Sequence, residues 1–101
     1  MSMITDVVVV AMYSEADAIS HVNAALAAAG EEQCLRPLDM SAAGGSKVIT
    51  ARVWAASFSY LDWSALRDAL MAAPWRFPRD VTILADGDSG ISERLIPGDP
   101  Q

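Results

Sequence analysis

VVVVAMY, residues 7–13, is the stretch that decides the fold of this chain. Asp6 precedes the run and Ser14 follows it. Four consecutive valines favour extended backbone, and an apolar run without alternation has no polar side to turn towards water. Such a run is typical of a central strand that is buried on both faces. We therefore predict a strand that begins near Thr5 and has neighbouring strands on both sides.

A helix signal follows this strand at once. Ser14 and Asp17 have the spacing of a capping box, in which polar side chains bond the first free backbone amides of a helix. Gly30 can take the left-handed conformation that ends many helices. We predict a helix over residues 15–29 with Ser14 as its N-cap. Its inward face is predicted from apolar residues that recur three and four positions apart, namely Ile19, Val22, Leu26 and Ala29.

A hairpin is predicted in the middle of the chain. Residues 33–38 form its first strand, and Pro37 places that strand at an edge of the sheet because proline has no amide hydrogen to donate. The glycine-containing loop 41–46 leads into residues 47–60, the longest strand candidate. Two strands joined by a short loop of this kind are typical of a hairpin.

The last third of the chain supplies a second helix and two more strands. Asp62 is predicted as the N-cap of the helix, and Pro74 ends it. The inward stripe of this helix comprises Trp63, Leu66, Leu70 and Ala73. Residues 81–85 form a fourth strand, and residues 91–96 can return as a short fifth strand.

The predicted order of elements is β-α-β-β-α-β, with an extra C-terminal strand. This order is that of the ferredoxin-like fold, an α+β sandwich with an antiparallel sheet and two helices on one face. Its strand order, 4-1-3-2, places the first and third strands in the centre, and these are the most apolar strands here. We predict one domain over residues 1–101, of which about 97–101 form a flexible tail.

The charge of the chain argues against nucleic-acid binding, and its few histidines and cysteines argue against a zinc site. The chain carries 13 acidic and 7 basic residues, a net charge of −6, whereas proteins that bind DNA or RNA usually carry a basic face. The single histidine, His21, and the single cysteine, Cys34, are too few for a zinc site of ordinary composition. We expect no nucleic-acid partner, no metal and no cofactor.

The sequence predicts a cytoplasmic protein. Asp6 lies where a signal peptide needs basic residues, and residues 7–13 are far shorter than the ~20 apolar residues of a membrane span. A lone cysteine permits no disulfide within the chain, so nothing indicates an oxidising compartment. We expect no membrane partner. The abundance of alanine, and of arginine over lysine, is typical of bacterial or phage coding sequences.

The third strand is predicted to carry an interface. Side chains alternate between the two faces of a strand, and the compact apolar set is assigned to the helix side: Ile49, Ala51, Val53 and Ala55. The set with aromatics and a charge, which includes Arg52, Trp54 and Phe58, is assigned to the open face. Because monomers rarely expose large apolar patches, we predict that Arg52, Trp54 and Phe58 contact a second copy or another protein. Alternatively, the C-terminal segment or the aromatics at 75 and 77 fold back over this face.

Residues 75–79, WRFPR, form the most unusual stretch of the chain. Two arginines interleaved with two aromatic rings, close in sequence to Arg67, can hold a phosphate, a carboxylate or an acidic peptide. The residues of such an anion or partner site are Arg67, Trp75, Arg76 and Arg79. The alternative is a rigid connection, framed by proline, whose rings fill the end of the core.

The titratable residues form no catalytic constellation. His21 is predicted to be exposed on the first helix, and Cys34 to be a small buried hydrophobe. Residues 86–90, DGDSG, resemble the start of a calcium loop but lack its later glycine and glutamate, so we predict a hairpin turn. No nucleophile has a base beside it, and no pair of carboxylates has a suitable spacing. The sequence weighs against enzyme activity.

Three functions remain open on these grounds. The first is a non-enzymatic interaction or assembly module that dimerises or docks a partner through the open sheet face. The second is a small-molecule-binding domain that resembles ACT-type regulatory domains in topology but lacks their glycine-bearing turn after the first strand. The third is an enzyme that resembles the dimeric, cofactor-independent monooxygenases in topology but lacks a histidine on a strand. Scarce titratable chemistry favours the first.

Overall fold

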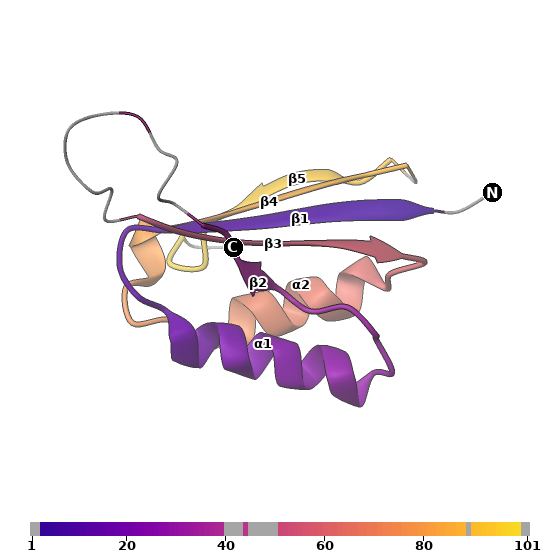
Figure 1. Ribbon diagram of the computed structural model, residues 1–101, viewed down its shortest axis with the longest axis horizontal. Helices are drawn as coiled ribbons and strands as arrows, with labels where there is room; N and C mark the ends of the chain where they lie inside the picture. Colours follow the sequence, from indigo (N-terminus) through magenta and orange to yellow (C-terminus); the bar gives the residue numbers. More distant parts are fainter. Residues whose placement is uncertain (1–2, 40–43, 45–50, 89, 100–101) are drawn as a thin grey trace.

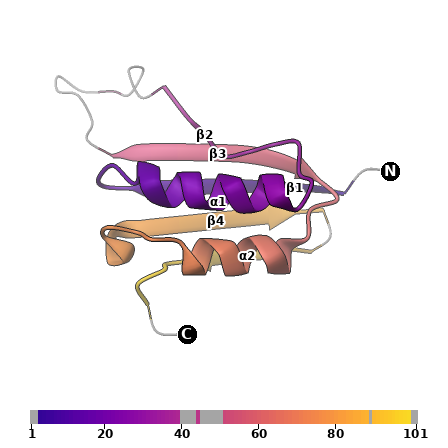
Figure 2. The same ribbon diagram turned by 90° about the horizontal axis from the view of Figure 1, so that it is seen from below.

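The protein is a two-layer α+β sandwich (Figure 1). A computed structural model describes residues 3–39, 44, 51–88 and 90–99. One layer is an antiparallel sheet of five strands in the order β2-β3-β1-β4-β5. The strands are β1 (Ile4–Ala11), β2 (Arg36–Pro37), β3 (Arg52–Ser59), β4 (Val81–Gly87) and β5 (Ser92–Leu95). The helices α1 (Ala16–Ala28) and α2 (Trp63–Ala72) lie side by side on one face of the sheet (Figure 2), and a short 3-10 helix, η1 (Pro78–Asp80), precedes β4.

The valine run forms the central strand, as predicted. β1 pairs with β3 along one side and with β4 along the other. Val7, Val9 and Ala11 are buried in the core, whereas Val8 and Val10 on the other face are half-buried. The strand order 4-1-3-2 is present within the sheet, and β5 extends it beyond β4. Pro37 lies in the edge strand β2, where its missing amide leaves no sheet hydrogen bond unmade.

The bounds of all five strands differ from the prediction: β1 ends at Ala11 and not at Tyr13, β4 continues to Gly87, and β5 spans Ser92–Leu95. The largest differences are in β2 and β3. Only Arg36 and Pro37 of the predicted strand 33–38 form ladder pairs, although the backbone N–H of Leu38 also donates to the carbonyl of Val53 at 2.8 Å. β3 begins at Arg52. The predicted start of that strand and most of the loop 41–46 lie outside the described residues.

The hairpin turn predicted at residues 86–90 connects β4 to β5. The two strands are antiparallel, with Asp86 opposite Ser92 and Ile83 opposite Leu95. Within the turn, the backbone N–H of Gly87 donates to the carbonyl of Ile91 at 2.9 Å. The predicted fifth strand is therefore present.

The start of α1 corrects the prediction. Its N-cap is Glu15, not Ser14, and no side chain caps its first turn. The Glu15 carboxylate accepts hydrogen bonds from the backbone N–H groups of Arg76 at 2.7 Å and Phe77 at 3.0 Å. A capping box is a purely local signal, and here a bond to residues about sixty positions away draws Glu15 into the interior, where only 1% of it is exposed. The helix therefore begins one residue later than predicted.

The predicted end of α1 and start of α2 are confirmed, whereas Ala29, predicted on the inward face of α1, is exposed at its C-cap. Gly30 takes φ +83° after α1, and the backbone N–H of Glu31 donates to the carbonyl of Leu26 at 3.0 Å, the bond of a Schellman cap. Asp62 caps α2 by accepting a bond from the backbone N–H of Ala65 at 3.2 Å. Within the described ranges no helix has both the length and the apolar character to cross a membrane.

The two faces of β3 are the reverse of the prediction. Residues opposite one another in the ladder share a face, so Trp54, opposite Val9, and Phe58, opposite Thr5, lie on the helix side. Phe58 is fully buried and Trp54 is 7% exposed, and both belong to the core. The predicted interface of Arg52, Trp54 and Phe58 is therefore wrong for both aromatics, while Arg52 lies exposed at the start of the strand.

Side-chain volume explains this reversal. The buried residues of the two helices are aliphatic, namely Ala18, Ile19, Val22, Leu26, Leu66 and Leu70. The large rings on the sheet pack with these aliphatic side chains and fill the space between the layers. Burying a ring removes far more apolar surface from water than burying an alanine or a valine.

Candidate functional site

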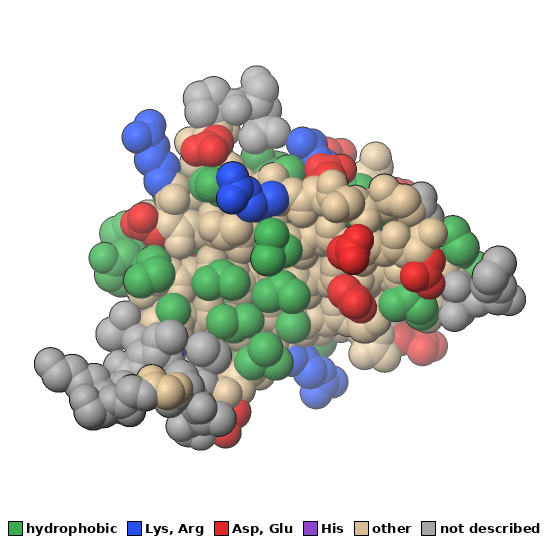
Figure 3. All heavy atoms as spheres, turned by 90° about the horizontal axis from the view of Figure 1, so that it is seen from above, with side chains coloured by type: hydrophobic (Ala, Val, Ile, Leu, Met, Phe, Trp, Pro, Cys, Tyr) green, Lys and Arg blue, Asp and Glu red, His purple; other side chains and the backbone are tan. Residues whose placement is uncertain are grey.

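The face of the sheet without helices carries an apolar centre. The ladder places Val8 between Ala55 and Leu84, and Val10 between Val53 and Thr82. We call the five apolar residues of these two rows the open patch: Val8, Val10, Val53, Ala55 and Leu84. Leu84 is 44% exposed, and the other four are half-buried. Figure 3 shows hydrophobic side chains gathered at the centre of this face.

Among the described residues, the ladder places four charged side chains beside the open patch. Arg36 lies opposite Ala55 at one edge of the sheet, and Arg94 lies opposite Leu84 near the other edge. Asp6 and Asp86 lie directly opposite each other in the next row. All four are exposed, and none forms an ion pair with another described residue. Figure 3 shows basic side chains above and below the patch and acidic ones to its right.

A shallow hollow lies between the aspartates and Arg94. Its lining includes Val8 and Leu84 from the open patch, together with Asp6, Asp86, Ser92 and Arg94. The lining therefore combines apolar side chains with charged and hydroxyl groups. A hollow of this composition suits a side chain with an apolar stem and a charged end, such as arginine or lysine.

The described residues after β5 pack away from this face. The backbone N–H of Gly98 donates to the carbonyl of Pro78 at 3.0 Å, which ties residues 96–99 to η1. Trp75 is buried among the core residues and does not cover the open patch. The sequence also offered the C-terminal segment or the aromatics at 75 and 77 as a cover for the open face. In the part of the chain that the structure describes, neither covers it.

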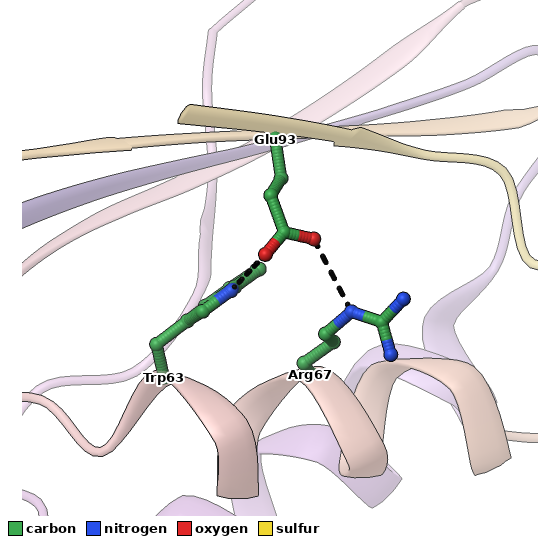
Figure 4. Close-up of polar contacts among 3 residues, drawn as sticks. All are labelled: Trp63, Arg67 and Glu93. Carbon is green, nitrogen blue, oxygen red and sulfur yellow. Dashed lines mark hydrogen bonds and ion pairs between the residues drawn. The ribbon is translucent and has the colours of Figure 1, made fainter. Parts of the chain in front are cut away.

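Arg67 points to β5 instead of joining the predicted anion site. Its Nε donates to the carboxylate of Glu93 at 3.2 Å, and the same carboxylate accepts a bond from Trp63 Nε1 at 2.9 Å (Figure 4). The bond from Trp63 is the largest cause of a lowered pKa of Glu93. Desolvation, the second-largest cause, opposes it, and the hydrogen bond and the charge of Arg67 lower that pKa further. These contacts join α2 to the edge of the sheet.

The other residues of the predicted anion site divide between core and surface. Trp75 is buried, and its Nε1 donates to the carbonyl of Leu70 at 2.7 Å. Arg76 and Arg79 are exposed, and the Arg76 guanidinium lies 5.3 Å from the centre of the Phe77 ring. Trp75 thus fits the alternative interpretation, in which a ring of this connection fills the end of the core. Arg76 and Arg79 remain at the surface, separate from Arg67.

Glu15 is a structural residue that sequence reasoning missed. Its carboxylate accepts two backbone bonds from residues 76 and 77 and so fastens the start of α1 to the segment after α2. Beside this contact the rings of Tyr13 and Phe77 lie 4.6 Å apart, centre to centre. No signal in the neighbouring sequence marks this role, because the partners of Glu15 are two backbone amides distant in the chain.

A second hollow lies between the two helices. It has a volume of about 170 Å³ and an apolar lining that includes Leu26, Leu61 and Leu66, with Glu31, Asp62 and several alanines beside them. Its volume is close to the ~150 Å³ of an engineered cavity that binds benzene. Tyr60, also in the lining, has a left-handed backbone with φ +54°. This hollow suits a small apolar molecule.

The candidate catalytic residues are not assembled in the described part of the chain. His21 is exposed on α1, as predicted, and Cys34 is half-buried where a buried position was expected. Among the described residues, no three histidine, cysteine, aspartate or glutamate side chains come together in a group that could hold a metal ion.

Comparison of the chain with protein-family models, with curated proteins and with solved structures finds no match.

Proposed function

We propose that this protein is a non-enzymatic interaction module that docks another protein chain through the open face of its sheet. The observation that carries the proposal is the open patch on the one sheet face that the helices leave uncovered. In this proposal the scaffold is of the ferredoxin-like type, with β5 as an added edge strand. Its element order and strand order support that assignment.

The composition of the open face supports docking of a protein. Interfaces commonly combine an apolar centre with a polar rim. Here the centre is the open patch, and the rim carries Arg36, Arg94, Asp6 and Asp86. Covering the patch is worth about 25 cal/mol for each Å² of apolar surface removed from water. Because the two aromatics of β3 lie in the core, the patch is smaller than the sequence indicated, and weaker association is expected.

The hydrogen bonds of Glu15 and Glu93 favour this function over catalysis. Glu15 accepts two backbone bonds, and Glu93 accepts bonds from Trp63 and Arg67. Both therefore join secondary-structure elements, which is a structural role and not that of an acid or a base.

The test introduces a charge into the open patch. Leu84→Asp places a carboxylate at the most exposed apolar position of the patch, and Ala24→Asp adds the same charge on the exposed side of α1 as a matched control. Tagged protein in extracts of its own cells is sized by gel filtration. We expect wild type and Ala24→Asp to elute well above the 10.7 kDa of one chain, and Leu84→Asp to elute as a single chain with unchanged circular dichroism. Elution of wild type as a single chain would contradict the proposal.

A second candidate function, binding of a small apolar molecule, rests on the hollow between α1 and α2. Ala69→Leu fills part of that hollow, whereas Ala72→Leu adds the same side chain at an exposed position on the same helix. We expect benzene or toluene to raise the melting temperature of wild type and Ala72→Leu but not of Ala69→Leu. An equal response in all three proteins would exclude this site.

A further inference from the structure

We propose that the partner on the open face is a second copy of this chain, packed so that Arg94 of each copy reaches the hollow beside Asp86 of the other. The inference rests on the proposed function of the open face and names its partner. It follows from three features of that face: an aspartate pair, a nearby arginine and a balance of charge.

The aspartate pair is unfavourable in a single chain. Asp6 and Asp86 are directly opposite on β1 and β4 and point to the same face. Like charges at directly opposite positions of an antiparallel ladder destabilise the sheet. Neither aspartate forms an ion pair with another described residue. A cation brought by a partner would relieve this repulsion.

Arg94 is the cation whose position fits. It is opposite Leu84, and Ser92, two residues earlier on β5, is opposite Asp86. Arg94 therefore lies one row away from the aspartates, on the other side of the hollow that all three line. Its stem can rest on the apolar part of that hollow while its guanidinium forms two parallel bonds with a carboxylate.

Two-fold symmetry converts this one-row offset into contacts between copies. Consider a two-fold axis in the plane of the interface that runs perpendicular to the strands and passes midway between the two rows. This axis places the row of Asp6 and Asp86 over the row of Val8, Leu84 and Arg94 of the other copy. Rows on one face are about 6.7 Å apart and strands about 4.8 Å apart. Arg94 of the second copy therefore lies over Ser92, one strand away from Asp86, and its long side chain can extend into the hollow beside Asp86. Each contact occurs twice in a symmetric dimer. An axis parallel to the strands would instead place aspartates over aspartates.

The balance of charge favours a second copy over an arbitrary acidic or basic partner. The chain has a net charge of −6, so two copies repel each other overall. Among the described residues, however, the charged side chains that the ladder places beside the open patch are two arginines and two aspartates, which sum to zero. The open face is therefore a surface on which two copies can meet without net repulsion, and opposite charges can pair across it.

A charge exchange tests the inference with purified protein. Sedimentation equilibrium is measured up to about 1 mM protein, a range that detects even weak complexes. We expect wild type to reach twice the mass of 10.7 kDa, and Arg94→Glu and Asp86→Arg each to weaken the dimer at least tenfold. The double variant R94E/D86R exchanges the two charges and is expected to restore the wild-type dissociation constant within about threefold. Asp17→Arg, on the exposed side of α1, is the control and leaves the dimer unchanged.

Salt supplies a second readout. Added ions screen both the Arg94–Asp86 pairs and the overall repulsion between two chains of charge −6, so the readout is a comparison with a variant that lacks the pair. Raising the salt concentration should disfavour the wild-type and double-variant dimers relative to the dimer of Arg94→Gln. An equal salt dependence in wild type and Arg94→Gln would contradict the pairing of Arg94 with Asp86.

The failure of this inference can be told apart from failure of the proposed function. A dimer that Leu84→Asp dissociates but that neither charge variant weakens would overturn the Arg94–Asp86 packing and keep the open face as the docking surface. Wild type that remains a single chain at about 1 mM would overturn the second copy as partner. If its complex in cell extracts is still lost in Leu84→Asp, the docking function stands with another protein as its partner.

Discussion

The two faces of the sheet differ in the size of their apolar side chains as well as in charge. On the covered face β3 carries Trp54 and Phe58 and β4 carries Ile83, all buried under the helices. On the open face the same strands carry Val53, Ala55 and Leu84, which are equally apolar but mostly smaller. In β3, where apolar residues occupy both faces, hydrophobicity alone does not assign the faces, whereas the larger side chains lie in the space beneath the two helices.

Because of this difference, we expect the covered face to determine the stability of the fold and the open face to determine association. The covered face holds the large rings and is expected to carry the free energy of unfolding. The open face holds a smaller apolar area with charges beside it, and it is expected to affect stability little and association strongly. Neighbouring residues on one strand, which point to opposite faces, test this separation directly.

The largest expected effect comes from truncating the covered face. Phe58→Ala is expected to cost about 3–5 kcal/mol and Ile83→Ala about 2–5 kcal/mol, because both side chains are fully buried and leave a cavity. Leu84→Ala, the next residue on β4, should cost less than about 1 kcal/mol. Urea unfolding at dilute protein concentration measures all three. Equal losses for Ile83→Ala and Leu84→Ala would show that the faces do not divide in this way.

The next largest effect is expected at the buried carboxylate that fixes the helix layer. Glu15→Ala leaves the backbone N–H groups of Arg76 and Phe77 without their acceptor, which should cost about 1–3 kcal/mol in unfolding experiments. Asp17→Ala, on the exposed side of the same helix, is the matched control and should change stability by less than about 0.5 kcal/mol. A Glu15→Ala variant as stable as the control would contradict this role.

A smaller effect distinguishes the two helix starts. Asp62→Ala removes the side-chain bond to the backbone N–H of Ala65 and should cost about 1 kcal/mol. Ser14→Ala should be close to neutral, because Ser14 precedes the N-cap of α1 and no side chain caps that helix. Thermal unfolding of both variants beside wild type measures the difference. A clear loss in Ser14→Ala would restore the capping box that the sequence predicted.

The smallest effect is a dependence on pH at Glu93. The folded protein lowers the pKa of Glu93, so its bonds to Trp63 and Arg67 contribute stability above the pKa of the unfolded chain. That contribution is lost as the pH falls through the lowered value. The advantage of wild type over Glu93→Gln should thus be at most about 1 kcal/mol at pH 7, as for an exposed pair, and should shrink on acidification. Arg94→Gln, the adjacent residue on the open face, should show no such trend in urea midpoints at the two pH values.

The sequence predicted the elements whose signals are local or periodic. The valine run specified the central strand, Pro37 an edge strand, Gly30 the end of α1 and Asp62 the start of α2. Each signal acts within a few residues through backbone conformation or a single hydrogen bond. The local structure that such a signal predicts forms in the folded protein unless a distant residue binds the same side chain.

The candidate site could not be predicted from the sequence of one strand, because it depends on which face the helices cover and on how the strands pair. Alternation in β3 shows that the strand has two faces but not which face the helices cover, since both sets are apolar. Glu15 bonds the distant backbone of Arg76, and the capping box predicted at the start of α1 is not formed. Arg67 pairs with the distant Glu93 instead of joining the arginines that are close to it in sequence. The open patch itself became visible only when the register set Val8 beside Ala55 and Leu84.

The position of β1 at the centre of the sheet also affects how the chain folds during synthesis. Residues 4–11 are made first, but their ladder partners are residues 52–59 and 81–87. The sheet cannot close on both sides of β1 until residue 87 has been added, and pairings over such long separations form slowly. During that interval four consecutive valines present a strand with two unpaired edges, a segment prone to aggregate with other chains. The charge of Asp6 immediately before the valines opposes such stacking, so this residue is expected to matter for yield in the cell as well as for the folded surface.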